Sequence, residues 1–235
     1  MIAKILSDAG MSVCFNKEGS NQIEGVVTLI LSECTLKGKL KRDVLLFEAD
    51  ERFSRLIFQH IHPTHFVLTN LFRDQLTRNG HPEWVFDAIC QAAKSAGKLV
   101  LNADDPLVSL LREGRENTIW YGADPQPDSK PYPDSIYDDG RFCPRCGERM
   151  TYDYRIYNHL GSYHCRSCRY SRHDRDFVLE NYLSDFSAMN IRTDSANYPI
   201  TLQNPSLFAA YNHLAAFALA SDLGISGPTD RKSVV

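Results

Sequence analysis

The sequence predicts an α/β fold, in which a mostly parallel sheet is flanked by helices and a four-cysteine zinc ribbon is inserted. Three observations lead to this prediction: apolar runs alternate with helical patterns, polar clusters follow the runs, and four cysteines stand in two close pairs. The apolar runs are residues 44–47, 66–68, 99–101 and 118–121. Because these runs are apolar throughout and do not alternate, they are typical of strands that are buried on both faces of a parallel sheet.

Helical patterns lie before and between the apolar runs. Within residues 21–37, one stripe consists of Ile23, Val26, Val27, Ile30 and Leu31, and Gly38 follows as a C-terminal stop. Further helices are expected over residues 51–60, 82–96, 104–113 and 205–219. A Pro- and Asp-rich linker at 125–133 precedes the cysteines, and a small antiparallel hairpin region is expected over 177–201.

Composition excludes several classes of protein. The chain has 235 residues, of which 43% are hydrophobic and 23% charged, so it is neither disordered, collagen-like nor a coiled coil. No run approaches the roughly 20 apolar residues of a membrane span. Lys4 and Asp8 interrupt the N-terminal pattern, unlike a secretory leader, and the seven cysteines do not suit a disulfide framework, so we expect a cytoplasmic protein. The net charge of -3 gives no overall field that would recruit nucleic acid or an anionic membrane.

A short polar cluster follows each of three apolar runs. The clusters are Glu48, Asp50 and Glu51; Thr69, Asn70, Arg73 and Asp74; and Asn102, Asp104 and Asp105. In open parallel sheets ligands bind beyond the carboxyl ends of the strands, so these clusters are expected to converge on one crevice. Carboxylate and amide oxygens suit Mg²⁺ and its phosphates. The alternative is that these residues only cap the helices that follow them.

The cysteine module gives the strongest local signal. Cys143 and Cys146 form one C-x-x-C pair, and Cys165 and Cys168 form a second one eighteen residues later. This spacing predicts a structural zinc site with a β-hairpin between the two pairs. A redox role is disfavoured because the two pairs occur together and neither opens a helix after a strand. Since four thiolates close the coordination sphere, such a zinc ion stabilises a fold and leaves no position for substrate.

The region from 139 to 177 is basic and rich in tyrosine. It contains eight arginines and five acidic residues, a local charge of +3. Its tyrosines are Tyr152, Tyr154, Tyr157, Tyr163 and Tyr170. Arginine combined with aromatic residues also describes proteins that bind single-stranded nucleic acid. The other interpretation is a small domain with too few aliphatic residues for a core, which metal stabilises and arginine solvates.

Four short segments carry a resemblance to a known family. Residues 47–51 (FEADE), 69–76 (TNLFRDQL), 101–105 (LNADD) and 211–216 (YNHLAA) resemble the central domain of the Mur ligases. The Arg-Asp-Gln-Leu variant with an inserted four-cysteine ribbon is similar to the group of these ligases that amidates lipid II. The resemblance implies a first part of the central domain at 1–138, a ribbon insertion at 139–177, the remainder of the domain at 178–229 and a non-native tail at 230–235.

Membership of that group implies ATP-dependent amidation of the D-glutamate α-carboxylate in the lipid II stem peptide. The carboxylate is first activated as an acyl phosphate, which ammonia then attacks. A GatD-like glutamine amidotransferase subunit would supply the ammonia within a heterodimer, at the inner face of a bacterial membrane. The cofactors implied are ATP, Mg²⁺ and a structural Zn²⁺, and no nucleic acid is expected as a partner.

The resemblance also implies roles for individual residues. Glu48 matches the Mg²⁺-binding glutamate of the family, and Asn212 matches the asparagine that contacts adenine. Asn70, Asp74 and Gln75 lie in the segment that borders the nucleotide site. Gln75 stands where most Mur ligases carry a metal-associated histidine.

Other features depart from the family pattern. Ser206 and Ala209 replace the usual Gly and Asn of the related helix, and no G-x-x-x-x-G-K-[ST] phosphate loop occurs. The resemblance implies that the family's catalytic acid lies beyond the end of this chain, so no catalytic residue is assigned. Residues 230–235 match one translation frame of a sequencing adapter. We therefore expect a fragment cut at both ends, which binds about one zinc ion but does not turn over ATP alone.

Two rival functions remain open. One is a nucleic-acid-binding zinc-ribbon protein on an α/β scaffold, for which Arg166 and Arg169 would provide salt-dependent contacts to oligonucleotides. The other is a different Mur ligase or a folylpolyglutamate-type ligase, which Gln75 and the ribbon disfavour.

Overall fold

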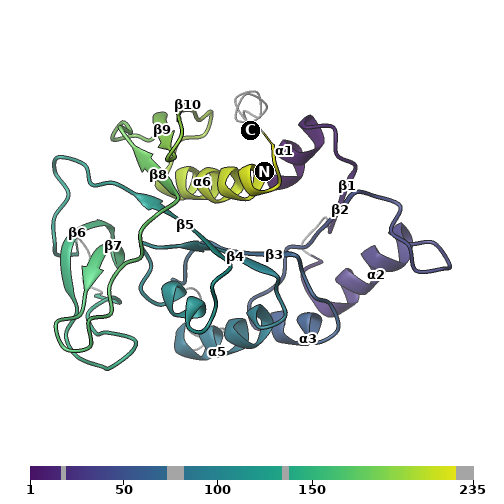
Figure 1. Ribbon diagram of the computed structural model, residues 1–235, viewed down its shortest axis with the longest axis horizontal. Coiled ribbons are helices and arrows are strands. Elements are labelled where there is room, and N and C mark those ends of the chain that lie inside the picture. Colours follow the sequence, from purple (N-terminus) through teal and green to yellow (C-terminus); the bar gives the residue numbers. More distant parts are fainter. Residues whose placement is uncertain (17–19, 73–81, 134–137, 226–235) are drawn as a thin grey trace. The chain divides into compact units, whose positions relative to one another are not determined.

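The computed structural model describes residues 1–16, 20–72, 82–133 and 138–225. The elements of the N-terminal part are α1 (Ile2–Asp8), β1 (Val13–Phe15), α2 (Ile23–Glu33), β2 (Val44–Leu46), α3 (Ser54–Phe58), β3 (His65–Leu68) and α5 (Pro82–Ala93). They are followed by β4 (Lys98–Asn102), η1 (Val108–Arg112), β5 (Thr118–Ala123), β6 (Thr151–Tyr157), β7 (Leu160–His164), β8 (Phe177–Glu180), β9 (Ala188–Arg192), β10 (Asn197–Thr201) and α6 (Leu207–Asp222) (Figure 1).

The chain divides into two compact units. The first comprises Met1–Phe66 and Phe72–Gly97, together with the end of α6 from Ala220. The second comprises Val67–Leu71 and Lys98–Leu219. The boundaries therefore fall inside β3 and inside α6.

In the first unit, β1 and β2 pair in parallel, and helices α2, α3 and α5 share a small core. This core consists of Val26, Ile57, Phe58 and Ala92, against which Ile23, Ile30, Phe47, Ala49, Ile61 and Phe66 pack. The predicted apolar stripe of α2 is narrower than expected. Ile23, Val26 and Ile30 follow the i, i+3, i+7 spacing of one face, whereas Val27 and Leu31 lie one step around the helix and are exposed.

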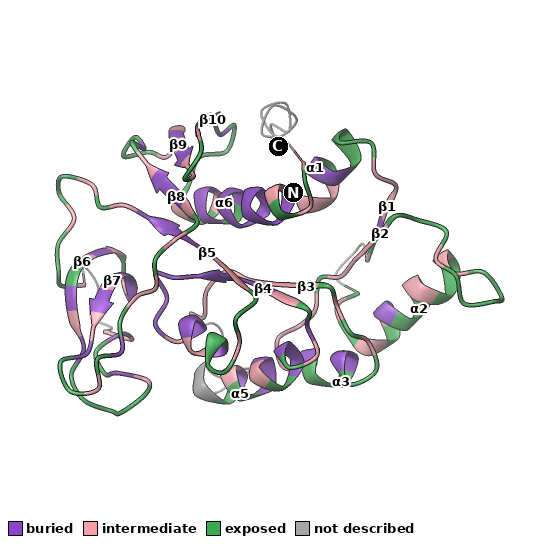
Figure 2. Ribbon diagram, in the orientation of Figure 1, coloured by how far each residue is buried: buried purple, intermediate pink, exposed green. Residues whose placement is uncertain are grey.

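The second unit is built on the six-stranded sheet, in the order β10-β9-β8-β5-β4-β3. The pairs β4–β5 and β5–β8 are parallel, which confirms the predicted parallel arrangement. The expected antiparallel hairpin region over 177–201 is confirmed, since β8 pairs antiparallel with β9 and β9 with β10. Because β8 also pairs with β5, this region continues the main sheet. Helix α6 lies beside these strands (Figures 1 and 2). The ring of Phe217 on α6 contacts the rings of Phe177 and Tyr198.

The segment after β4 differs from its prediction. An α-helix was expected over 104–113, but the chain forms a 3₁₀ helix over Val108–Arg112. Before it, a carboxylate oxygen of Asp105 accepts the backbone N–H groups of Leu107 and Val108 at 2.9 and 3.1 Å. These bonds form a tight capped turn and leave only five residues for the helix.

The predicted hairpin between the cysteine pairs is confirmed, since β6 and β7 pair antiparallel as a separate two-stranded sheet. Among the helices in the described ranges, none is long and apolar enough to cross a membrane.

Candidate metal centre and the polar end of strand β4

The structure brings the four predicted cysteines together. All four sulfur atoms lie within 4.8 Å of one another. The Sγ atoms of Cys143 and Cys168 are 3.6 Å apart, as are those of Cys146 and Cys165. A tetrahedral site with Zn–S bonds of about 2.3 Å places its sulfur atoms about 3.8 Å apart. The four side chains therefore fit a zinc ion.

The two cysteine pairs use the same backbone turn. The N–H of Gly147 donates to the carbonyl oxygen of Cys143 at 2.9 Å, and the N–H of Arg169 donates to that of Cys165 at 3.0 Å. Gly147 and Arg169 occupy equivalent positions with positive φ angles of 77° and 61°. Glycine adopts this region without steric cost, whereas an arginine there is strained. The repeated turn thus has the geometry of two metal knuckles.

The thiols of the centre differ in their readiness to ionise. Backbone N–H groups, that of Cys168 first and then that of Ser167, lower the pKa of Cys165 to about 7. Burial raises the pKa of Cys143 to about 12. A buried thiolate of this kind requires a cation close to its sulfur, and Zn²⁺ supplies one.

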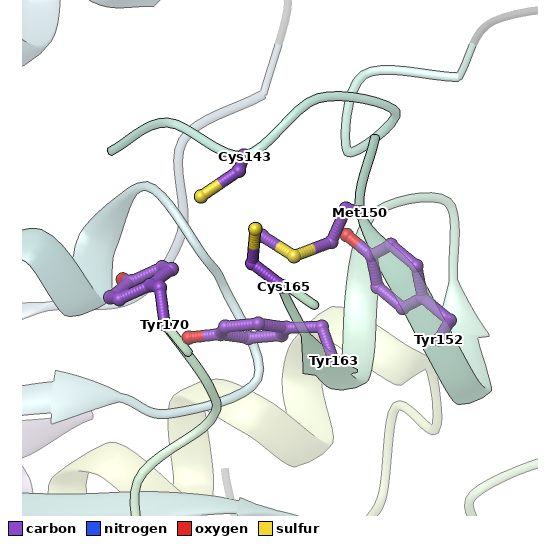
Figure 3. Close-up of a cluster of buried hydrophobic side chains, with 6 residues drawn as sticks. All are labelled: Cys143, Met150, Tyr152, Tyr163, Cys165 and Tyr170. Atoms are coloured by element: carbon purple, nitrogen blue, oxygen red, sulfur yellow. The ribbon is translucent and has the colours of Figure 1, made fainter. Parts of the chain in front are cut away.

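An aromatic cluster packs against two of the four cysteines, Cys143 and Cys165. It consists of Cys143, Met150, Tyr152, Tyr163, Cys165 and Tyr170, all of which are buried (Figure 3). The Tyr163 ring lies in the middle, 5.8 Å from that of Tyr170 and 6.1 Å from that of Tyr152. These three tyrosines form the core of the small domain, so they are not exposed platforms on which bases could stack.

The arginines of the ribbon divide into two groups. Arg141, Arg145, Arg149, Arg166 and Arg169 are exposed around the knuckles. Arg155, Arg172 and Arg175 are buried or half-buried and pair with Asp138, Asp104 and Asp124 at 2.9, 3.1 and 2.8 Å. The second group therefore stabilises the fold.

Asp104, at the polar end of β4, is fully buried. One carboxylate oxygen accepts the N–H of Ala123 at 2.6 Å and the hydroxyl of Tyr211 at 2.7 Å. The other oxygen accepts a guanidinium N–H of Arg172 at 3.1 Å. Burial raises the pKa of Asp104, and the positive charges of Arg172 and Arg175 oppose this effect.

Asp105 is also fully buried, and it does more than cap η1. Its second oxygen accepts the backbone N–H of Leu71 at 2.8 Å and lies 3.2 Å from Nε2 of His159. The capping alternative is thus correct for Asp105, and neither Asp104 nor Asp105 is open to a cation from solvent. Sequence reasoning did not find His159 as a partner of this cluster, because nothing in the spacing links it to β4.

Asn102 completes the end of β4. Its side-chain oxygen accepts the N–H of Asp104 at 3.0 Å. Its buried amide nitrogen has no hydrogen-bond partner within the described parts of the chain. The three polar residues predicted here therefore form a buried network.

The residues expected to bind nucleotide belong to both units. Glu48 is exposed in the first unit, where the side chain of Asn16 bonds to its backbone N–H and carbonyl at 2.8 and 2.7 Å. In the second unit, Asn70 is half-buried, and Asn212 is exposed on α6 beside the buried Tyr211. Asp74 and Gln75 lie outside the described residues. The tail at 230–235 lies outside them too.

Comparisons with known proteins identify proteins of similar sequence. No protein-family profile matches it. It is 30% identical over 231 residues to the MurT subunit of lipid II isoglutaminyl synthase from Staphylococcus aureus (strain COL), covering 97% of this chain and 50% of that protein. It is 31% identical over 225 residues to MurT from Streptococcus pneumoniae (strain ATCC BAA-255 / R6), covering 94% and 48%. The chain thus spans about half the length of these relatives.

Solved structures share the fold. A pseudomurein peptide ligase type C from Methanothermus fervidus superposes with a TM-score of 0.78 at 26% identity, over 98% of this chain and 44% of that one. MurF from Acinetobacter baumannii superposes with a TM-score of 0.62 at 13% identity, over 98% and 41%, which shows a common fold alone. The chain is therefore similar to MurT in sequence and to the Mur ligases in fold, over about half the length of these proteins.

Proposed function

We propose that the chain is part of the ligase subunit of a lipid II isoglutaminyl synthase, which acts in peptidoglycan synthesis. The observation that carries this proposal is the match to MurT, which extends over 97% of the chain and includes the four-cysteine centre region. The proposal extends to the domain division at 1–138, 139–177 and 178–229, with the ribbon as an insertion. It also includes a GatD-like partner and a position at the inner face of the bacterial membrane.

The proposed reaction has two steps. A carboxylate oxygen of the stem-peptide D-glutamate attacks the γ-phosphorus of ATP, ADP leaves from that phosphorus, and an acyl phosphate forms. Ammonia, which the partner releases from glutamine, then attacks the acyl carbon. The bond from this carbon to the phosphate oxygen breaks, and the amide forms as inorganic phosphate and a proton are released. Because the charge that develops lies on phosphoryl oxygens, catalysis depends on positioning and on Mg²⁺.

The roles proposed for Glu48 and Asn212 require side chains that a ligand can reach. Glu48 would bind Mg²⁺ and Asn212 would contact adenine, and both side chains are exposed while their neighbours fix the backbone. Asn70, Asp74 and Gln75 are proposed to border the same nucleotide. The four cysteines would hold Zn²⁺, which would stabilise the ribbon.

The first test measures the chain itself. We expect about one zinc ion per chain, measured by elemental analysis, and no turnover of MgATP. Robust ATPase activity of the chain alone would contradict the proposal as it stands. Salt-dependent binding of an oligonucleotide, lost in Arg166→Ala and Arg169→Ala, would instead support the nucleic-acid-binding alternative.

The second test measures the reaction in a chimera. The chain would replace the matching half of the Staphylococcus aureus MurT subunit, and amidation of lipid II would be followed by mass spectrometry of the stem peptide. We expect Glu48→Gln to abolish amidation and Asn212→Ala to raise the KM for ATP. Exposed control residues, changed as Glu24→Gln and Gln203→Ala, should have no effect. A zinc-loaded chimera that binds MgATP but never amidates lipid II would refute the substrate assignment.

A further inference from the structure

We propose that the zinc ribbon positions the nucleotide-site segments of the second unit, through two buried carboxylates at the end of β4. His159 and Arg172 of the ribbon are the positioning residues. They act through Asp105 and Asp104 on the segment that carries Asn70 and on helix α6 at Asn212. The statement that these two segments bind a nucleotide rests on the proposed function. The coupling of the ribbon to the two segments rests on the contacts described below.

The first connection runs from His159 to Leu71. His159 lies between β6 and β7 and is only 3% exposed. Its Nε2 lies 3.2 Å from the Asp105 oxygen that also accepts the backbone N–H of Leu71 at 2.8 Å. Leu71 directly follows Asn70 in the chain. One buried oxygen atom therefore joins the ribbon to the backbone beside a predicted site residue.

The second connection runs from Arg172 to helix α6. Arg172 donates to one oxygen of Asp104 at 3.1 Å, and the hydroxyl of Tyr211 donates to the other oxygen at 2.7 Å. Tyr211 is fully buried and directly precedes Asn212. Since the guanidinium and the hydroxyl share one carboxylate, the position of each depends on the other.

The ribbon itself fixes both donors. The backbone N–H of Arg172 donates to the carbonyl oxygen of Tyr163 on β7 at 3.0 Å. The hydroxyl of Tyr152 donates to the carbonyl oxygen of His159 at 3.1 Å, and Tyr152 belongs to the aromatic cluster around the cysteines. The N–H of Gly161 on β7 donates to the backbone carbonyl of Asp104 at 2.9 Å. Loss of the metal would loosen this cluster, and with it the hydrogen bonds that reach the end of β4.

The alternative is that the two carboxylates only stabilise the fold. A merely structural role predicts that changes in the ribbon weaken the whole second unit evenly. Positioning predicts a local effect, confined to the backbone near Leu71 and to α6 near Asn212. Strands β9 and β10, at the edge of the sheet opposite β3, should keep their protection.

The experiment measures amide hydrogen exchange by NMR in the zinc-loaded chain. In His159→Leu we expect the exchange of the Leu71 amide to rise at least tenfold, while zinc remains bound and the amides of β9 and β10 stay unchanged. In His159→Gln, whose side-chain amide can donate to Asp105, most of the protection should return. His164→Leu is the matched control, because His164 lies on the same hairpin with a side chain that is 39% exposed, and the change should leave Leu71 unaffected.

A second variant and a nucleotide titration complete the test. Tyr211→Phe removes only the hydroxyl that meets Asp104, so we expect faster exchange around Asn212 with the helix retained. Titration with MgATP should show a several-fold weaker affinity in His159→Leu than in His159→Gln. Unchanged exchange at both places, or an even rise over the whole unit, would overturn the coupling. If the wild-type chain binds no MgATP, the nucleotide assignment fails, and the exchange data still decide the coupling.

Discussion

The four-cysteine centre and the polar end of β4 are both clusters of side chains that require burial and precise partners, but they are assembled differently. The cysteine sulfurs come from one local module, with Cys143 and Cys168 only 25 residues apart. Asp104 and Tyr211 are 107 residues apart. The four-cysteine centre is therefore encoded by local spacing, whereas the carboxylate network exists only once the sheet, the ribbon and α6 have come together.

The energetic consequences also differ. A structural zinc ion contributes folding free energy directly, because its site does not exist in the unfolded chain. A buried ion pair recovers the cost of removing two charges from water only when every partner is present. We thus expect that loss of a cysteine unfolds the ribbon. Loss of a buried carboxylate should instead weaken the contacts that join the ribbon to the sheet and to α6.

The largest effect is expected for the cysteines. Cys165→Ser should abolish zinc binding and unfold the ribbon, since apparent binding free energies of about 10–16 kcal/mol accompany such sites. Elemental analysis and near-ultraviolet circular dichroism of the clustered tyrosines would measure this loss. Cys34→Ser is the matched control, because Cys34 lies outside the four-cysteine centre. A Cys165→Ser chain that keeps a full zinc ion would contradict the assigned ligand set.

A smaller but still large effect is expected at Asp104. Asp104→Ala leaves Arg172 and the Tyr211 hydroxyl without their shared acceptor, which should lower the free energy of unfolding by about 3–5 kcal/mol. Urea unfolding monitored by circular dichroism would measure the change. Asp194→Ala, at an exposed position, should have almost no effect. Equal stability of the two variants would show that the network does not support the fold.

An intermediate effect is expected where the two regions meet. The Tyr170 hydroxyl donates to the carbonyl oxygen of Pro106 at 2.7 Å, next to Asp105. Tyr170→Phe keeps the ring in the aromatic cluster but removes this bond, so stability should fall by about 1 kcal/mol. Tyr157→Phe, whose ring is partly exposed, serves as the control in the same unfolding experiment. A loss of zinc in Tyr170→Phe would mean that the bond also supports the metal centre.

The sequence predicted the elements better than their connections. Strands β2 to β5 fall within two residues of the predicted runs, because fully apolar segments signal burial on both faces. The hairpin between the cysteine pairs was predicted because a tetrahedral site brings two knuckles together. The continuation of the sheet from β8 into β10 was not predicted, since alternation identifies strands but not the strand beside which they pair.

The same limit applies to the candidate site. Asp104 and Asp105 were recognised as a polar cluster after a strand, but their burial was not, because no local pattern points to Arg172, His159 or Tyr211. The identity of a buried carboxylate's partners is set by tertiary structure. The four cysteines could be assigned because their ligand chemistry and spacing are sufficient by themselves.

The smallest expected effect is on the pH dependence of the free energy of unfolding, and it arises from a histidine on α6. Burial lowers the pKa of His213, which lies two residues after the Tyr211 that contacts Asp104. As the pH falls, this histidine takes up a proton near pH 6.5 in the unfolded chain. In the folded chain it remains neutral at that pH. The contribution of His213 to the free energy of unfolding should consequently be fully present above about pH 6.5 and should decrease as the pH falls below that value.

His213→Gln removes this titration and keeps a polar side chain of similar length. In urea unfolding at several pH values between about 8 and about 6, with zinc in the buffer, the wild-type chain should lose more stability than the variant. Because loss of zinc at low pH affects both proteins equally, the difference between them isolates the buried histidine. If both proteins lose stability equally as the pH falls, the acid sensitivity comes from the four-cysteine centre and not from His213. The polar end of β4 and α6 would then make no contribution to the pH dependence of unfolding.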